Sequence, residues 1–317
     1  MGQINRIGSR VRGMFFSGTG TTEKIVTATA DGITRSSDRF CRAQDIDFTP
    51  PGAREQVYRF APEDILVFGV PVIAGRVPNV LLPFLNTLEG GGAMAIPVVL
   101  YGNRDFDDAL IELRNILEER GFHTVAAAAF IGEHSFSRVL AAGRPDERDM
   151  QIAEDFAKAA AAKIEKLAAE AEVAQTERLA AEAEAAQTEQ QAAEAEVAGT
   201  PDQLLHDLEP IEVDGEDPIR PYYKPRDRQG NHINILKVKP KLDASKCTKC
   251  GICVAACPMG SIKPEAPGVV DGICIKCCGC EKKCPEGALY FDDEGYLYHK
   301  TELELGYPDR KEPKLFI

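Results

Sequence analysis

The chain has 317 residues, which is the length of about two domains, and it carries a formal net charge of −13. Hydrophobic residues make up 44% and charged residues 27%, the proportions of an ordinary globular protein. The sequence has no basic stripe that would indicate nucleic-acid binding and no run of about 18 apolar residues that would cross a membrane.

The negative charge is concentrated in one segment and says little about partners. Residues 168–200 hold eight glutamates and one arginine, so 7 of the 13 net negative charges lie there. The first ten residues have neither an apolar core nor a cleavage site, so we do not predict a signal peptide. We therefore expect a cytoplasmic protein without membrane contact; the sequence does not indicate an oligomeric state.

The first elements along the chain are a predicted strand at residues 10–16 and a predicted helix at 23–34. The loop between them is rich in glycine and hydroxyl side chains. Glycines let the backbone approach a phosphate, hydroxyls donate hydrogen bonds, and the helix N-terminus supplies unpaired N–H groups. The loop has no lysine and no G-x-G-x-x-G pattern, so it is neither a Walker A motif nor a dinucleotide fingerprint. Its residues are Ser17, Gly18, Thr19, Gly20, Thr21 and Thr22.

Alternation of strands and helices continues through the N-terminal half. We predict buried strands at 64–70 and 95–101, a helix at 107–120 and a fifth strand near 123–130. Ligands of open parallel sheets bind outside the carboxyl ends of the strands. The loops that follow the first, third and fourth strands therefore share one ligand site.

This half of the chain resembles flavodoxin, whose phosphate loop has the pattern Ser/Thr-x-Thr-Gly-x-Thr, matched here by Ser17, Thr19, Gly20 and Thr22. The resemblance implies FMN as cofactor, with Thr19 and Thr22 at its phosphate. The chain has no tryptophan. Either Tyr101 or Phe106 takes the place of the usual stacking tryptophan, or the ring face is open toward a partner. The implied ring contacts are Pro71, Val72, Ala74, Gly75, Arg76, Tyr101, Gly102, Asn103, Arg104 and Phe106.

Arg76, Arg104 and residues 132–135 have two interpretations each, whereas Cys41 has one. Arg76 and Arg104 either favour a reduced, anionic flavin or are solvated loop charges. Residues 132–135, Gly-Glu-His-Ser, either close the pocket or form a plain loop, and we favour the plain loop. Cys41 is interpreted as a buried thiol.

The middle of the chain is a predicted helix at 146–167 followed by a repeat with a period of 12 residues at 168–199. Twelve residues rotate a helix face by about 120°, so the copies form no common apolar stripe. We interpret the repeat as an exposed spacer that keeps the flanking modules near one another without a fixed contact. A connector with six prolines follows at 201–241.

Nine of the ten cysteines lie in residues 247–284, in two runs with the spacing C-x2-C-x2-C-x3-C-P. This is the spacing of bacterial ferredoxins with two [4Fe–4S] clusters, in which the fourth cysteine of each run binds the other cluster. Each ligand of the first run recurs 27 positions later. The first predicted set is Cys247, Cys250, Cys253 and Cys284, and the second is Cys274, Cys277, Cys280 and Cys257.

Disulfides or zinc are the competing interpretations of so many cysteines. A disulfide scaffold has no reason to repeat this spacing, and zinc would use two C-x2-C pairs per metal. Cys278 is out of register with both runs, and we interpret it as a spare thiol beside the second cluster. We predict short strands at 261–263 and 288–291, after each run.

The predicted fold class is α/β: a flavodoxin-like doubly wound parallel sheet with strand order 2-1-3-4-5, then a helical and irregular linker, then a small α+β two-cluster ferredoxin domain. This order resembles a family of flavodoxin–ferredoxin fusion proteins of anaerobes. The predicted segments are 1–167 (flavodoxin-like), 168–200 (repeat spacer), 201–241 (connector), 242–295 (ferredoxin) and 296–317 (tail).

The resemblance implies an electron-transfer protein that passes electrons between two [4Fe–4S] clusters and FMN, with a redox protein as donor or acceptor. It needs no acid, base or nucleophile, so we predict no catalytic residue. Two alternatives stay open. One is an FMN-dependent reductase of a small oxidised substrate. The other is an iron–sulfur sensor of oxygen or redox state whose flavodoxin-like domain no longer binds FMN.

Overall fold

The computed structural model describes residues 6–187 and 208–317. Its centre is a sheet with the strand order β12-β7-β5-β4-β1-β2, in which β3 also pairs with β1 and β6 with β5. All pairings except β12 with β7 are parallel. The five predicted strands correspond in chain order to β1, β2, β4, β5 and β7, so the predicted order 2-1-3-4-5 is confirmed. The strands are β1 (Arg10–Phe15), β2 (Cys41–Arg42), β3 (Ile46–Asp47), β4 (Asp64–Pro71), β5 (Met94–Tyr101), β6 (His123–Thr124), β7 (Ala127–Ile131) and β12 (Lys314–Phe316).

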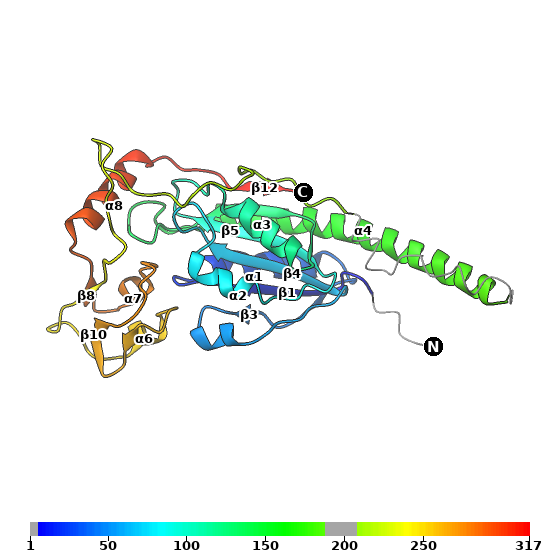
Figure 1. The fold of residues 1–317 in the computed structure, drawn as a ribbon, viewed down its shortest axis with the longest axis horizontal. Coiled ribbons are helices and arrows are strands. Elements are labelled where there is room, and N and C mark those ends of the chain that lie inside the picture. Colours follow the sequence, from blue (N-terminus) through cyan, green and yellow to red (C-terminus); the bar gives the residue numbers. More distant parts are fainter. Residues whose placement is uncertain (1–5, 188–207) are drawn as a thin grey trace.

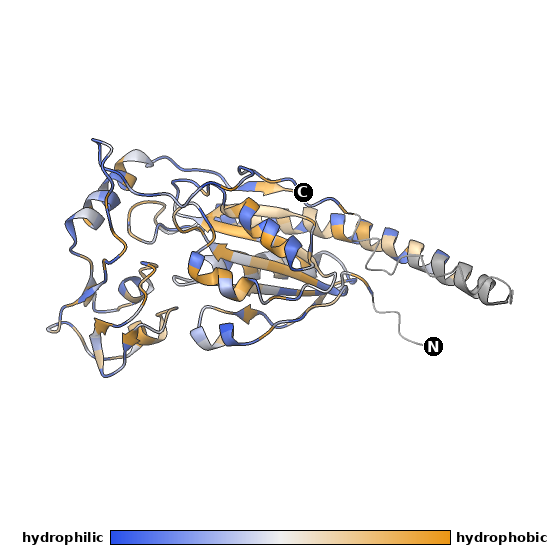
Figure 2. Ribbon diagram, viewed as in Figure 1, coloured by the Kyte–Doolittle hydropathy of each residue, from blue (hydrophilic) through white to orange (hydrophobic). Residues whose placement is uncertain are grey.

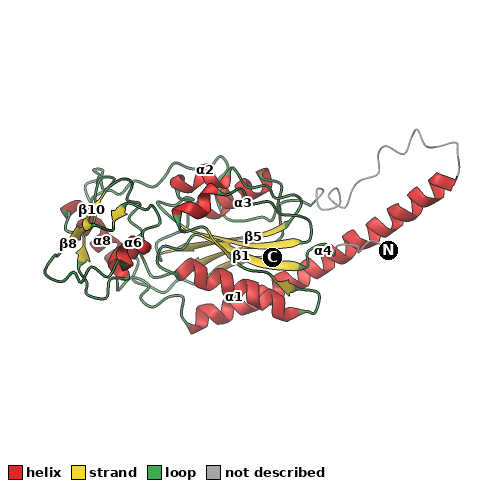
Figure 3. Cartoon of the chain, turned by 90° about the horizontal axis from the view of Figure 1, so that it is seen from below, coloured by secondary structure: helices red, strands yellow, loops and turns green. Residues whose placement is uncertain are grey.

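Helices cover both faces of this sheet, as Figure 3 shows from the side. α1 (Thr21–Ser36) and α4 (Glu147–Gln187) lie on one face, and α2 (Leu82–Leu85) and α3 (Ala109–Glu119) on the other. Two short 3₁₀ turns, at Pro51–Glu55 and Asn79–Leu81, lie in the connecting loops. The predicted helices at 23–34 and 107–120 correspond to α1 and α3.

The central strands are apolar along their whole length because both of their faces are covered. Every residue of β5 is buried, and so is every residue of β4 except Pro71. Figure 2 shows these strands as the most hydrophobic part of the molecule. Each face of the sheet has its own core, one beneath α1 and α4 and one beneath α2 and α3.

The predicted boundary at residue 167 is wrong, because α4 continues without a break into the 12-residue repeat. Ala168 and Ala171 are buried in the core beside α1, and Glu172 accepts a hydrogen bond of 2.6 Å from Arg39. Val173, by contrast, is 58% exposed. The first copy of the repeat is therefore part of the flavodoxin-like domain, although later turns of α4 project away from it (Figure 1). Repeat residues 188–199 lie outside the described residues.

The connector packs along the flavodoxin-like domain. Asp108, buried at the start of α3, accepts hydrogen bonds from the amides of Glu216 and Arg220 and from the Arg220 guanidinium. These bonds outweigh the opposing effect of burial and lower the pKa of Asp108 to about 2. Tyr222 donates its hydroxyl to the Val77 carbonyl at 2.8 Å. Residues 211–223 are thus fixed to the domain.

The ferredoxin elements gather at the carboxyl end of the sheet strands, at the end of the molecule away from the projecting part of α4 (Figure 1). Two antiparallel strand pairs, β8 with β11 and β9 with β10, frame the two cysteine runs. The predicted strands at 261–263 and 288–291 are confirmed as β9 and β11. The elements are β8 (Lys241–Leu242), α6 (Ile252–Ala255), β9 (Ile262–Lys263), β10 (Ala266–Val270), α7 (Gly279–Lys282) and β11 (Leu289–Tyr290).

The segment predicted as a tail returns to the first domain. It begins with α8 (Glu294–Gly306) and ends with β12, which pairs antiparallel with β7 so that Lys314 lies opposite Ala129 and Phe316 opposite Ala127. Phe316 packs on the core beneath α2 and α3. The predicted boundary at residue 295 falls inside α8. The segment therefore contributes to both the ferredoxin-type region and the first domain.

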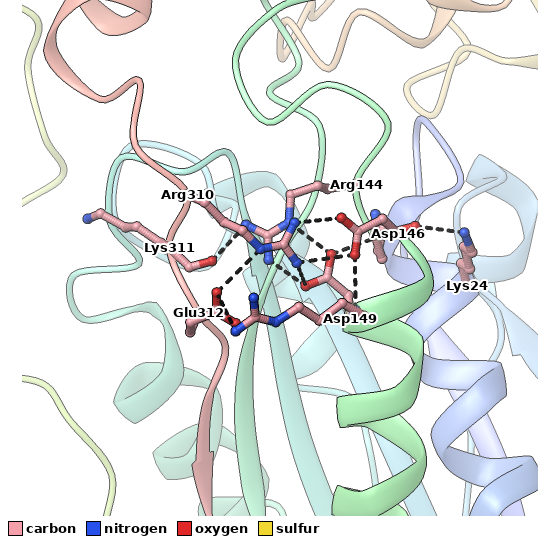
Figure 4. A network of polar contacts seen from close by, with 9 residues as sticks. Lys24, Arg144, Asp146, Asp149, Arg310, Lys311 and Glu312 are labelled. Atoms are coloured by element: carbon pink, nitrogen blue, oxygen red, sulfur yellow. Dashed lines mark hydrogen bonds and ion pairs between the residues drawn. The ribbon is translucent and has the colours of Figure 1, made fainter.

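A network of arginines and carboxylates holds this returning segment beside the start of α4 (Figure 4). Arg144 binds the fully buried Asp149 through two hydrogen bonds and donates a third, of 2.7 Å, to the Lys311 carbonyl. Arg310 donates to Asp146 at 2.5 Å and to Asp149 at 3.2 Å. Removal of one partner would leave a buried charge unpaired, which is strongly destabilising. The network therefore fixes residues 310–312 in place.

None of the helices in the described part of the chain combines the length and the apolar character needed to span a bilayer.

Candidate functional site

The predicted phosphate loop lies between β1 and α1 and is shaped by two of its own residues. Gly20 has φ +98°, a left-handed conformation that favours glycine, and it directly precedes α1. Ser17 accepts a hydrogen bond of 3.1 Å from the Glu23 amide and donates its own amide to Thr49. Ser17 therefore organises the loop. The amides of the first turn of α1, at Thr21 and Thr22, have no preceding helical carbonyl to bind.

A cavity of about 260 Å³ lies at the carboxyl ends of β1, β4, β5 and β7, where the sequence predicts the ligand. The predicted phosphate loop and both predicted ring loops border it. Its hydroxyl groups include those of Thr19 and Thr21, whose oxygens are 3.5 Å apart. Predicted site residues that border the cavity are Gly18, Thr19, Thr21, Thr22, Pro71, Val72, Ala74, Gly75, Tyr101, Gly102 and Arg104.

Five residues of the predicted site do not border this cavity: Ser17, Gly20, Arg76, Asn103 and Phe106. Arg76, predicted as a flavin contact or a solvated charge, is neither. It forms two hydrogen bonds, of 2.7 and 2.6 Å, to the buried Glu112, and its guanidinium lies 4.8 Å from the Tyr222 ring. Its charge is therefore used to fix the loop and the connector to α3.

Asn103 and Phe106 are also turned away from the cavity. Asn103 donates two hydrogen bonds of 2.8 Å to the carbonyls of Tyr307 and Asp309, in the segment between α8 and β12. Phe106 is buried in the core, with its ring centre 5.5 Å from that of Tyr101. Of the two aromatic residues predicted at the flavin ring, only Tyr101 borders the cavity, and burial raises the pKa of its hydroxyl to about 12.

About half of the cavity wall consists of residues that the sequence did not predict. The loop at 132–136, interpreted as a plain loop, borders the cavity, and so do parts of the connector, α8 and the second cysteine run. No motif marks Tyr223 as a site residue, although its amide binds the Ala74 carbonyl at 2.8 Å and its ring lies 4.5 Å from the Arg104 guanidinium. The missed residues include Glu133, His134, Phe136, Tyr223, Pro225, Ile235, Leu236, Ile275, Lys276, Cys277, His299 and Leu303.

The two predicted cysteine sets each surround a small cavity. Cys247, Cys250 and Cys253 border one together with Cys284 of the other run. Cys274, Cys277 and Cys280 border the other together with Cys257. All ten cysteines of the chain are unpaired thiols, and no three metal-binding side chains of the described residues converge on a single ion. The four thiolates that hold a [4Fe–4S] cubane lie further apart than the ligands of a single ion, because each thiolate binds a different iron atom.

Backbone amides point at the sulfur atoms in both halves of the duplication. The Ser261 amide donates to Cys257 and the Ala288 amide to Cys284, each at 3.3 Å, and the two bonds are 27 residues apart. Hydrogen bonds of this kind tune the potential of an iron–sulfur cluster. Burial raises the pKa of the Cys277 thiol to about 11, and a metal ion that binds such a thiol displaces its proton.

The second cysteine run lies directly against the predicted phosphate loop. A Cβ atom placed on Gly18 would lie 3.1 Å from Cβ and 3.3 Å from Sγ of Cys277. A Cβ atom on Gly279 would lie 2.6 Å from the Gly18 carbonyl oxygen, closer than side chains approach. The expectation that the modules have no fixed contact is therefore wrong.

Hydrogen bonds reinforce this contact on both sides of the predicted phosphate loop. Lys282, in α7, donates from Nζ to Glu133 at 2.6 Å and to the carbonyls of His134 and Ser137 at 2.7 and 2.9 Å. On the other side, Arg54 donates to the Pro258 carbonyl at 2.5 Å. Cys41, interpreted as a buried thiol, is instead exposed in β2, at the edge of the sheet.

The fold and the two cysteine sets define an iron–sulfur protein with a flavodoxin-like domain and a ferredoxin-type domain. Residues 240–263, which include the whole first cysteine run, match the family described as "4Fe-4S binding domain".

Solved structures similar to this chain align with about half of it. A flavodoxin from the domain Archaea is 13% identical over 49% of this chain and 99% of its own, with a TM-score of 0.35. A flavodoxin from Streptococcus pneumoniae TIGR4 is 20% identical over 49% of this chain and 99% of its own, with a TM-score of 0.34. An NADH:FMN oxidoreductase is 19% identical over 47% of this chain and 88% of its own, with a TM-score of 0.36.

Proposed function

We propose that this protein transfers electrons between FMN, held at the carboxyl edge of the sheet, and two [4Fe–4S] clusters held by the two cysteine runs. The observation that carries the proposal is the contact of Gly18 with Cys277, which places a residue of the phosphate loop against a cluster ligand. When bound, FMN takes up and gives off electrons singly or in pairs, whereas each cluster carries one.

The residues around the cavity fit a phosphate ester with an aromatic ring. Thr19, Thr21 and Thr22 offer hydroxyls beside the N-terminus of a 16-residue helix, where a negative charge is favoured. The other walls are mostly apolar and include Val72, Tyr101 and Phe136. These residues would hold the phosphate at one end of the cavity and exclude water from the ring at the other.

The positions of the two cysteine sets relative to the cavity indicate the order in which electrons would pass between the sites. The second set is next to the cavity, since Cys277 borders both the FMN cavity and its own cluster cavity. The first set shares no residue with the FMN cavity, and there Cys250 is exposed and Ile252 is 39% exposed. We infer that a redox protein, as donor or acceptor, exchanges electrons at the first set.

The decisive experiment is to photoreduce the flavin of anaerobically purified protein and follow cluster bleaching at several dilutions. We expect a rate that does not change with protein concentration, because donor and acceptor are in one chain and in contact. A rate proportional to concentration would contradict transfer within the chain. Iron and flavin contents of the same sample test the cofactors themselves. Protein that takes up no FMN would favour the alternative of an iron–sulfur sensor. Turnover of a small oxidised substrate would favour the alternative of an FMN-dependent reductase.

Thr19→Val tests the phosphate loop. Loss of one hydrogen bond to a charged group costs about 1.5–3 kcal/mol, so FMN affinity should fall about ten- to a hundredfold. Thr34→Val is the matched control, because Thr34 lies in α1, the helix that follows the loop, and its hydroxyl donates to the Ala30 carbonyl. Equal affinities of the two variants in a fluorescence titration of FMN would argue against this loop as the phosphate site.

A further inference from the structure

His134 borders the cavity, and hydrogen bonds hold its backbone in place. Its amide donates to the Leu140 carbonyl at 3.1 Å, and its carbonyl accepts from the Ser137 amide at 3.1 Å and from Lys282 at 2.7 Å. The loop that carries it is thus bonded on both sides, once by a residue of the ferredoxin-type domain.

The imidazole ring is fixed as firmly as the backbone. It lies against Gly102, where a Cβ atom would be 2.3 Å from its Cδ2, so no larger residue fits there. Its other neighbour is the Phe136 ring, 5.2 Å away and nearly perpendicular. These contacts hold the ring in one orientation beside the loop predicted to contact the flavin.

The hydrogen bonds of the ring determine its tautomer. Nδ1 accepts a hydrogen bond of 3.1 Å from the Phe136 amide, so the proton of the neutral imidazole is on Nε2. Burial, with the positive charges of Lys282 and Arg104 and the neighbouring His299, lowers the pKa of His134 to about 3. The ring is neutral at physiological pH, and Nε2 is a donor only.

Among the described residues, none accepts a hydrogen bond from Nε2, and Nε2 is not one of the fully buried unpaired atoms. Nε2 therefore keeps some accessible surface, and His134 borders the cavity. A neutral donor held at a cavity wall suits an acceptor atom of the ligand, because it adds no charge and does not titrate.

We propose that His134 is a positioning residue of the flavin site, whose Nε2–H donates a hydrogen bond to an oxygen or nitrogen atom of the isoalloxazine ring. The proposal rests on the proposed function, since it requires FMN in this cavity. A donated hydrogen bond strengthens as its acceptor gains electron density. His134 therefore binds reduced FMN more tightly than oxidised FMN and raises the flavin potential.

The test is the two-electron midpoint potential of FMN in the complete protein, with clusters, at constant pH. His134→Phe keeps an aromatic ring over Gly102 and removes the donor. We expect it to bind reduced FMN about tenfold more weakly relative to oxidised FMN, which lowers a two-electron potential by about 30 mV. His134→Gln retains a donor and should restore part of this difference. Val139→Ala, at an exposed residue of the same loop that does not border the cavity, should leave the potential unchanged.

A wild-type potential in His134→Phe at full FMN occupancy would overturn the role of His134. So would a His134→Gln variant no better than His134→Phe, because a purely structural ring would give that result. If His134→Phe does not fold, His134→Leu removes the donor with a smaller side chain and is judged by the same two outcomes. Wild-type protein that binds no FMN would instead refute the proposed function, so the two failures are distinguishable.

Discussion

The two cysteine runs are copies of one sequence, but they lie in different surroundings. Backbone geometry repeats between them, with φ +57° at Lys249 and +54° at Lys276, and +60° at Gly260 and +55° at Gly287. Side chains do not repeat where the second run meets the flavodoxin-like domain. Exposed Ile252 in the first run corresponds to Gly279 in the second, which lies against the Gly18 carbonyl. Ala255 corresponds to Lys282, which binds the loop at 133–137.

The two runs differ at positions in the contact between domains and agree at positions that would serve the proposed clusters. The four predicted ligands, the positive-φ residues and the amides that bind sulfur are common to both runs, as we expect if each run folds around a cluster, as proposed. Gly279 and Lys282 are found only in the run that faces the other domain. Exchanging side chains between the copies therefore separates the two roles.

Of the substitutions that test this difference, Cys257→Ser should have the largest effect. Cys257 belongs to the first run in sequence, but it borders the cavity of the second set. We expect loss of about half the iron, all from the cluster next to the flavin cavity, while the first-set cluster persists. Mössbauer and electron paramagnetic resonance spectra of the anaerobic protein would show which cluster is lost. Spectra in which the exposed first-set cluster disappears instead would disprove the crossed ligand assignment.

Gly279→Ile, which copies the first-run residue into the second run, should separate the domains. The new side chain has no space beside the Gly18 carbonyl, and such overpacking costs about 1–3 kcal/mol when it is tolerated at all. We expect electron transfer between FMN and clusters to slow at least about tenfold while the iron content stays full. Ile252→Gly makes the reverse change at an exposed site and should not alter the transfer rate. Equal transfer rates in both variants would show that the contact does not matter.

Lys282→Ala copies the first-run alanine and should have a moderate effect that depends on pH. The Lys282 bond, together with one from the Gly143 amide, lowers the pKa of Glu133 although burial opposes this. A carboxylate with a depressed pKa stabilises the fold above its unfolded pKa of about 4.3, and this contribution disappears as pH falls through the folded pKa. The variant should lose about 2–3 kcal/mol near pH 7 and less below pH ~4.

Denaturant unfolding at several pH values measures this difference. Lys283→Ala is the control, since Lys283 is the next residue and no contact of its side chain with the other domain is observed within the described residues. A Lys282→Ala deficit that stays constant down to pH ~3 would mean that the two carbonyl bonds, and not Glu133, account for it.

Cys278→Ser should have the smallest effect. Cys278 occupies the place of Gly251 in the first run, keeps a left-handed backbone with φ +57°, and is only 2% exposed. Its sulfur lies 3.4 Å from the Tyr296 hydroxyl and 3.3 Å from the Lys276 carbonyl, partners that a serine hydroxyl also binds. We expect full iron content and a stability change within about 1 kcal/mol. Loss of iron would identify Cys278 as a ligand.

The sequence predicted the elements whose cause is local. Apolar runs gave the strands around Val67 and Val98, and the glycine- and hydroxyl-rich loop was placed correctly before α1. Cysteine spacing predicted both sets that the structure brings together. Each of these features depends on residues near one another in the chain, or on a motif whose geometry is fixed.

The parts that could not be predicted depend on contacts between distant segments. Tyr223 borders the cavity because Asp108 holds Arg220 more than 100 residues away in sequence. His134 faces the cavity because Lys282 binds its loop. Ala171 is buried because α1 lies beside it, although the repeat period alone gives no apolar stripe. No local pattern carries this information.

The pairing of β12 with β7 has a consequence for synthesis on the ribosome. Strand β7 is made by residue 131, but its outer edge acquires a partner only when residues 314–316 have been added. In the interval the complete ferredoxin-type region must emerge, at about 5–20 residues per second. An unpaired edge strand is a template for pairing with other chains. Nascent chains stalled before residue 314 should therefore aggregate on crowded polysomes, even though all the cluster ligands have already been synthesised.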